Sequence, residues 1–195
     1  EIQNLLLLLC KLLYYENKLK KLDQERNSIQ HIRHECDQWK ESGLDINYVF
    51  KVQDDSNHSS REYTLLHFAA NFGDRNVRKL LFAEGAGVDV KDQNGNTPLH
   101  LSAANETVKL LLDNGANVNL ISHTKTGHEA APLLLAIMSG SPEMVELLLN
   151  NGANVNLRHN KGMTQLHASV LKGNIEIAKL LLNNGAGVNL TNRDK

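Results

Sequence analysis

The sequence predicts an all-α fold, a solenoid of stacked helix-turn-helix units with β-hairpin fingers, preceded by an N-terminal helical segment. Two motifs that recur with one period carry this prediction. The first is a tetrapeptide that begins, at intervals of 33, 34 and 33 residues, at Thr64, Thr97, Ala131 and Thr164. The second has the form Gly-Ala-x-Val and begins at Gly85, Gly115, Gly152 and Gly185. Two independent motifs with a shared period indicate units that bury their apolar faces against their neighbours.

Local signals mark where the helices of each unit begin and end. Pro98 and Pro132 suit the first turn of a helix, where a missing N–H leaves no bond unmade, and threonine hydroxyls can cap the same turn. In the third unit, Ser141 and Pro142 mark the start of the second helix in the same way. Each leucine-rich second helix runs into the glycine of the second motif, which suits a left-handed C-cap.

The tetrapeptides resemble the T-P-L-H signature of the ankyrin repeat, whose period is about 33 residues. They read Thr64-Leu65-Leu66-His67, Thr97-Pro98-Leu99-His100, Ala131-Pro132-Leu133-Leu134 and Thr164-Gln165-Leu166-His167. The resemblance covers about residues 64 to 191. It implies that His67, His100 and His167 hydrogen-bond within and between repeats and do not bind a metal.

The resemblance and the motif spacing together predict a domain organisation. We expect an N-terminal helical segment with a degenerate repeat or cap at 1–47, an exposed loop at 48–62, ankyrin repeats at 63–91, 92–125, 126–158 and 159–191, and the start of a truncated further repeat at 192–195. In the second repeat the interval from Thr97 to Gly115 is three residues short, which we assign to the turn around Asn105 and Glu106. The finger that follows is four residues longer than the others.

The N-terminal segment has its own helical pattern. One helical face is formed by Ile29, Ile32, Cys36 and Trp39, which predicts a helix that stacks on the first clear repeat. Residues 2–22 form a second candidate helix, and the polar residues 23–28 are where the two would break. The alternative is one continuous coiled-coil helix. The apolar run at 5–13 is about half the roughly 20 residues that a membrane span requires.

Composition and motifs exclude several classes of function. Lys and Arg number 21 against 22 Asp and Glu, and this balance argues against a partner as acidic as nucleic acid. His31, His34 and Cys36 lack a fourth ligand for zinc. No G-x-S-x-G, Gly-rich phosphate loop or H-E-x-x-H occurs. We therefore expect no catalytic activity, cofactor, metal or small-molecule substrate.

The function that the resemblance implies is a non-catalytic scaffold that binds a protein partner on the concave ankyrin surface. The alternative is the binding region of a longer enzyme, or of a bacterial effector or toxin, with its catalytic domain outside this chain; the start at Glu1 rather than Met favours a fragment. Two cysteines give no disulfide framework and predict a cytoplasmic protein. Asparagine makes up on the order of a tenth of the residues, a bias that resembles ankyrin proteins of obligate intracellular bacteria and would place it in a host cytoplasm.

The resemblance also implies which residues contact the partner, namely those at finger tips and at the exposed end of each first helix. They are Arg61, Tyr63, Asn71, Phe72, Gln93, Asn94, Asn96, His128, Met138, Ser139, Arg158, Asn160, Lys161, Met163, Leu171 and Lys172. Among them, apolar side chains ringed by polar groups are typical of binding hot spots. The alternative is that Phe72 and Leu171 fold back onto the neighbouring helix.

Two further expectations concern the last repeat and the finger asparagines. The final helices lack the polar outer face of a capping unit, which predicts self-association through this repeat or fraying after about Ala178. Each of Asn119, Asn156 and Asn189 follows a leucine by eight residues, a spacing that resembles substrates of an animal asparaginyl hydroxylase. The alternative is that these asparagines only cap the hairpin turns.

Overall fold

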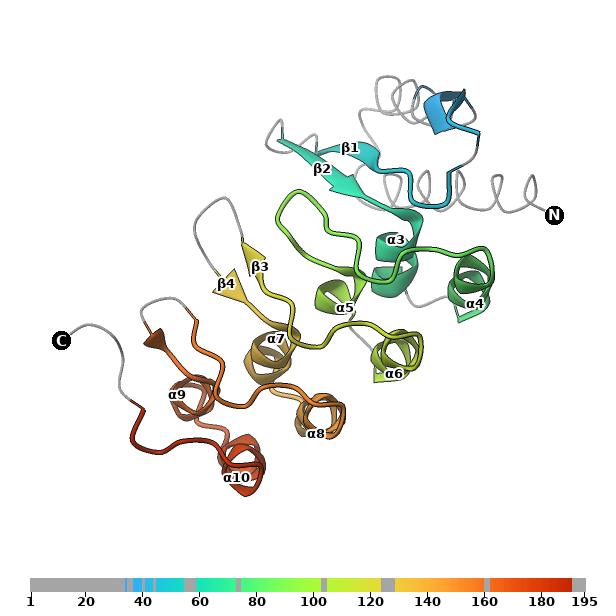
Figure 1. The fold of residues 1–195 in the computed structure, drawn as a ribbon. Helices are drawn as coiled ribbons and strands as arrows, with labels where there is room; N and C mark the ends of the chain where they lie inside the picture. The colour runs from blue at the N-terminus through green and yellow to red at the C-terminus, as the bar shows by residue number, and fades with distance from the viewer. Residues whose placement is uncertain are drawn as a thin grey trace, which may run out of the picture.

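The helices pair and stack in a single row, as the sequence predicts. The computed structural model describes residues 34, 37–39, 41–43, 45–54, 59–72, 75–102, 105–123, 129–159 and 162–190. The pairs are α3 (Leu65–Phe72) with α4 (Arg75–Ala83), α5 (Pro98–Leu101) with α6 (Asn105–Asp113), α7 (Pro132–Ser139) with α8 (Pro142–Asn150), and α9 (Gln165–Leu171) with α10 (Ile175–Asn183). The first helices of the pairs form one layer and the second helices form another (Figure 1).

A continuous core runs between the two layers. Each second helix carries a fully buried leucine at the same position. These leucines are Leu81, Leu111, Leu148 and Leu181. Burial of one such side chain stabilises the fold by about 1.5–3 kcal/mol. Because these leucines belong to one cluster of buried side chains that extends through all four repeats, the core links neighbouring repeats.

The predicted helix starts and stops are confirmed. Pro98 and Pro132 occupy the first helical turn of α5 and α7, and the Ser141 hydroxyl accepts a hydrogen bond from Met144 N at 3.3 Å at the start of α8. The second helices are each followed by a glycine in the left-handed region, with φ of 81° at Gly85, 84° at Gly115, 82° at Gly152 and 85° at Gly185. A side chain with a Cβ rarely adopts this conformation, so the glycines allow the chain to leave the helix sharply.

The second repeat is shortened at a different place from the one we expected. Asn105 and Glu106 lie in the first turn of α6 and not in an inter-helix turn. The missing residues are lost instead from α5, which has 4 residues where α3 has 8 and α9 has 7. The second helix of this repeat keeps 9 residues, the same length as α4, α8 and α10.

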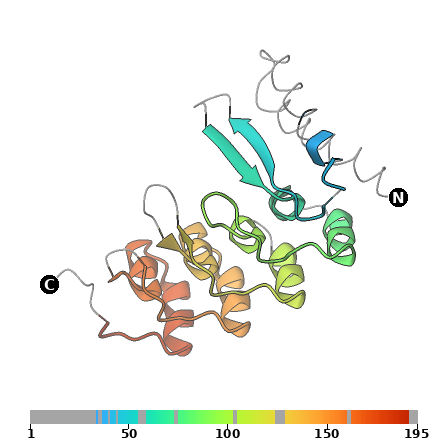
Figure 2. The ribbon, with the colours of Figure 1, turned by 45° about the horizontal axis from the view of Figure 1, so that its top comes forward.

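The segment expected to be an exposed loop at 48–62 is instead largely a hairpin. Strands β1 (Phe50–Asp54) and β2 (Ser59–Tyr63) pair antiparallel, with Phe50 opposite Tyr63. The hairpin stands beyond α3 at the N-terminal end of the stack (Figure 2). The polar composition concealed the strands because, within β1, apolar alternation extends only over Phe50 and Val52, too short a run for a period-two signal.

Among the residues that the structure describes, aromatic side chains close the N-terminal end of the core. Trp39 and Phe50 are both buried and meet edge to face, with ring centroids 5.4 Å apart. The Trp39 indole Nε1 donates a hydrogen bond to Asp45 O at 2.7 Å, so the polar atom of this buried ring is satisfied. Trp39 is the described member of the predicted helical face. Ile29, Ile32 and Cys36, the candidate helix at 2–22 and its break at 23–28 lie outside the described residues.

Candidate functional site

Two of the T-P-L-H histidines, His67 and His100, fix their first helix to the finger of the next repeat, while the hydrogen bonds of His167 to described residues stay within its own repeat. His67 Nδ1 accepts from Thr64 N at 3.2 Å, so its Nε2 carries the proton and donates to Asn96 O at 2.9 Å. His100 repeats the pattern with Thr97 N at 3.1 Å and Ala130 O at 3.2 Å. Burial lowers the pKa of both histidines, because desolvation disfavours the charged ring more than the carbonyl contacts favour it. Their role is structural, as the resemblance implies.

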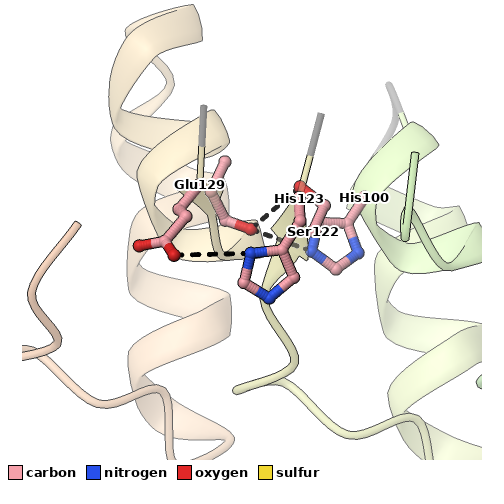
Figure 3. Close-up of polar contacts among 5 residues, drawn as sticks. His100, Ser122, His123 and Glu129 are labelled. Carbon is pink, nitrogen blue, oxygen red and sulfur yellow. Dashed lines mark hydrogen bonds and ion pairs between the residues drawn. The ribbon is translucent and has the colours of Figure 1, made fainter. Parts of the chain in front are cut away.

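His100 also holds the base of the long finger between the second and third repeats (Figure 3). Strands β3 (Ser122–His123) and β4 (Glu129–Ala130) pair antiparallel. Ala130 O accepts from Ser122 Oγ at 3.1 Å as well as from His100 Nε2. Across the strands His123 Nδ1 lies 3.4 Å from Glu129 Oε1, and both side chains are accessible to solvent. The base of the finger is therefore ordered against the array, while the residues at 124–128, including His128, lie outside the described part.

Two finger turns each contain a buried polar residue at the same position, an aspartate in one finger and a histidine in the other. In the second repeat Asp92 Oδ1 accepts from Asn94 N at 2.7 Å and from Asn96 N at 2.8 Å. His159 holds the same position in the fourth repeat, where its ring lies 2.8 Å from the side-chain amide of Gln165. Burial lowers the pKa of His159, and the Gln165 contact only partly opposes this.

An exposed strip follows the ends of the first helices, and we call it the first-helix strip. It consists of Asn71 of α3, Met138 and Ser139 of α7, Leu171 at the end of α9 and Lys172 directly after it. Met138 is 49% exposed and Leu171 is 74% exposed at equivalent positions of consecutive repeats. The exposure of Leu171 contradicts the alternative in which it folds back onto the neighbouring helix.

The other predicted contact residues have mixed surroundings. Tyr63 is half-buried, with its ring centroid 5.2 Å from that of Phe68, and Met163 packs against the core. Gln93, Asn94 and Asn96 are half-buried, and Arg158 is exposed. Of Arg61 and Phe72 the structure describes the backbone alone, and Asn160 and Lys161 lie outside the described residues.

A ladder of asparagine and aspartate side chains joins consecutive repeats, and it was not predicted from the sequence. Asn119 Oδ1 accepts from Asn154 N at 2.7 Å, and Asn119 Nδ2 donates to Gly152 O at 3.0 Å. The next junction repeats both bonds with Asn156, Gly187 N at 2.8 Å and Gly185 O at 3.1 Å. At the earlier junctions, Gly87 N donates to Asn47 Oδ1 and Asn117 N donates to Asp89. The signal was the Asn or Asp that recurs four residues after the glycine of each second motif.

The three asparagines predicted to be hydroxylated occupy positions of this ladder. Asn119 and Asn156 already hold the next repeat through both side-chain atoms, while Asn189 makes no hydrogen bond to any other residue that the structure describes. The turns themselves are capped two residues earlier, since Asn117 Oδ1 accepts from Asn119 N at 3.0 Å. Hydroxylation of Asn119, Asn156 and Asn189 stays a prediction.

The ladder also makes a stability prediction. Asn156→Ala removes two hydrogen bonds between the third and fourth repeats, which should lower the free energy of unfolding by about 1–2 kcal/mol. Urea denaturation followed by circular dichroism measures this. Asn189→Ala is the matched control, because its side chain joins no described repeat, and it should change stability by less than about 0.5 kcal/mol. Equal effects of the two variants would contradict the role given to the ladder.

Metal sites and membrane spans were sought among the described residues. In that part of the chain, no three His, Cys, Asp or Glu side chains are grouped so that they could hold a metal ion. None of the described helices has the length and apolar character needed to cross a bilayer.

Comparison with known proteins identifies the repeats. A family model described as ankyrin repeats (3 copies) matches residues 41–122 and 120–192. The ankyrin repeat protein FPV219 of fowlpox virus (strain NVSL) is 38% identical over 63 residues, which is 31% of this chain. The match spans 14% of that viral protein. The bacterial origin suggested by the asparagine content stays a prediction. The matched residues extend over most of the sequence, and the chain belongs to the ankyrin-repeat family.

Proposed function

We propose that the protein binds a protein partner on the concave face of its ankyrin array, with the first-helix strip at the centre of the contact. An ankyrin-repeat array is a protein–protein interaction module, and the proposal concerns where on this array the partner sits. The observation that carries it is the exposure of Met138 and Leu171 at the same position of consecutive repeats.

The surroundings of these two side chains suit a binding hot spot. Ser139 and Lys172 directly follow them and are exposed, so each apolar side chain has a polar neighbour. Apolar anchors with a polar rim are where binding energy concentrates in protein interfaces. The helices beneath are held by buried residues such as Ile137, so the backbone that carries the anchors is already positioned and binding costs mainly the rotamer entropy of the side chains.

The same surface would serve a chain acting alone or as the binding region of a longer enzyme or effector. No catalytic role is proposed for any residue, and the proposed partner is a protein rather than a nucleic acid. The balance of 21 basic and 22 acidic residues supports this choice, because binding to phosphate depends on an excess of basic groups. We place the protein in a reducing cytoplasm, its own or that of a host, where two cysteines stay free of disulfides.

The test is a paired truncation of the strip. We expect Met138→Ala with Leu171→Ala to weaken partner binding by about 2 kcal/mol or more, which is roughly 30-fold in the dissociation constant. Because Leu171 lies mostly in solvent and Met138 about half in solvent, the melting temperature should change by only about 1–2 °C. Proteins captured by the wild-type chain from the relevant cell are identified by mass spectrometry, and their affinity for each variant is then measured by calorimetry.

Ile175→Ala provides the matched control. Ile175 is as exposed as Leu171 but lies at the start of α10, in the other layer of helices. This variant should bind the partner with unchanged affinity. The proposal fails if the double variant binds normally, if it loses affinity only because it unfolds, or if Ile175→Ala weakens binding equally.

A further inference from the structure

Exposed basic side chains recur in the fingers of the array. Lys91 of the second repeat and Arg158 of the fourth occupy equivalent positions of their fingers, and both are exposed. Arg158 pairs with Thr164 across the base of its finger, which places Arg158 beside the start of α9. At the other end of α9, Lys172 directly follows the exposed Leu171. Basic residues therefore lie at both ends of this first helix.

The carboxylates of the same elements are partly or fully withdrawn from solvent. Asp92 is buried, and its Oδ1 accepts hydrogen bonds from the backbone of its own turn, at Asn94 N and Asn96 N. Glu129 is half-buried and lies 3.4 Å from the His123 ring across the long finger. Among the described side chains of the fingers, the first helices and the first-helix strip, the exposed charged groups are basic, and these are Lys91, Arg158 and Lys172.

The layer of second helices has the opposite balance (Figure 1). Glu106, Glu143 and Glu176 are exposed at one position that α6, α8 and α10 share, in the first turn of each helix. Asp113 and Glu146 are exposed as well. The exposed basic side chains described in this layer are fewer, and they are Lys79, Lys109 and Lys179. Because the whole chain has 21 basic and 22 acidic residues, this asymmetry arises from where the fold places the charges and not from composition.

Charges of one sign around apolar anchors select the class of segment that the surface attracts. Basic groups that border a concave surface raise its positive potential, which speeds association with acidic ligands and disfavours basic ones. A neutral apolar segment would cover Met138 and Leu171 but would leave the basic side chains without a counterpart. A nucleic acid would offer phosphates to Lys91 and Lys172 but little apolar surface to the two anchors. An acidic segment with apolar side chains matches both kinds of group.

We propose that the concave face selects an acidic segment of the partner protein, in which carboxylate side chains flank at least two apolar side chains. The apolar side chains contact Met138 and Leu171. The carboxylates lie towards Lys172 at the end of α9 and towards the finger cations Lys91 and Arg158. This inference rests on the proposed binding at the first-helix strip and adds the chemical class of the partner.

The test uses a library of random peptides displayed on phage and selected on the immobilised 195-residue chain at low ionic strength. Peptides that also bind the Met138→Ala, Leu171→Ala double variant are removed, so those that remain depend on the first-helix strip. We expect the remaining peptides to be enriched in Asp and Glu by about threefold over the unselected library. The affinity of a synthetic copy of one selected peptide should fall as the salt concentration rises, because salt screens exposed charge pairs.

Charge reversal on the two layers separates local complementarity from the net charge of the chain. Lys91→Glu with Lys172→Glu should weaken binding of the synthetic peptide by about tenfold or more, because attraction to carboxylates becomes repulsion. Lys109→Glu with Lys179→Glu is the matched control, since it changes the net charge equally through exposed side chains of the second helices. The control should change the affinity by less than about twofold. Thermal melting checks that both variants are folded.

Four results would overturn the inference, and they separate it from the proposed function. If the peptides that depend on Met138 and Leu171 are neutral or basic, the strip binds protein but does not select acidic segments. If the control reversal weakens binding as much as Lys91→Glu with Lys172→Glu, only the net charge matters. If a random-sequence oligonucleotide binds more tightly than every selected peptide and is lost in that same variant, phosphate is the target. If no selected peptide depends on the two anchors, the proposed function fails as well.

Discussion

Trp39→Ala is expected to lower the free energy of unfolding by about 3–5 kcal/mol, the cost of truncating a large buried aromatic side chain. Trp39 is 2% exposed, packs against Phe50 and forms the N-terminal end of the core. Trp39 and Phe50 form a pair of buried rings that we call the N-terminal cap. Loss of the Trp39 ring would open a cavity between this cap and the first repeat and leave Asp45 O without its indole partner. Urea denaturation followed by far-ultraviolet circular dichroism measures the change.

Two comparisons make this result specific. Trp39→Phe keeps a ring against Phe50 and should recover more than half of the loss. In the wild-type chain, Trp39 is the single tryptophan, so its fluorescence reports the N-terminal cap directly. If Trp39→Ala unfolds at the same urea concentration as the wild type, the cap is not energetically coupled to the array.

Acidification below about pH 6.5, the ordinary pKa of histidine, is expected to destabilise the fold steeply. Burial is the largest cause that lowers the pKa of His67, His100 and His159. As the pH falls from this value towards the depressed pKa values, the unfolded chain binds protons that the folded chain does not, so stability decreases. Each histidine contributes a slope of at most about 1.4 kcal/mol per pH unit.

The charges near these rings limit the effect without reversing it. Asp92 favours protonation of His67 and His100, and Lys91 opposes it at His100. At His159 the nearby Glu129 favours protonation. Urea unfolding at a series of pH values from 7.5 to 5 measures the slope, and a stability that is constant across this range would contradict the prediction.

A variant of the fourth repeat that copies two residues of the second repeat isolates the contribution of His159 to the pH dependence of stability. His159→Asp with Gln165→Pro recreates in the fourth repeat the pair formed by Asp92 and Pro98 in the second. We expect this double variant to lose less stability on acidification, because one buried base has been replaced. His67 and His100 are unchanged in it and should retain their share of the slope.

Periodic features of the fold were predictable from the sequence, and aperiodic ones were not. The histidine network and the glycine C-caps follow from motifs that recur, because each copy occupies the same environment. The β1–β2 hairpin and the shortened α5 occur once, so no second copy indicated their structure. The ladder recurs in every repeat but connects residues about 30 apart, and a pattern within one repeat does not reveal bonds between repeats.

The candidate binding surface was predictable to a similar degree. Met138 and Leu171 share a helix position, and the period alone placed them at equivalent points of the array. Whether Tyr63 and Met163 face solvent depends instead on how the hairpin and the fourth finger pack against the core, which local sequence does not determine. Both are half-buried.

The single turn of α5 has a mechanical consequence for the array. The 4-residue α5 offers α7 a shorter contact than the 8-residue α7 offers α9, although its contact with α3 remains extensive, so we expect the joint between the second and third repeats to resist bending least. Bending at this joint alters the separation between Asn71 and Met138 and leaves Met138 and Leu171 at constant spacing. We therefore expect a bound partner to meet a third and fourth repeat at fixed spacing and a first repeat whose position can adjust without unfolding any junction.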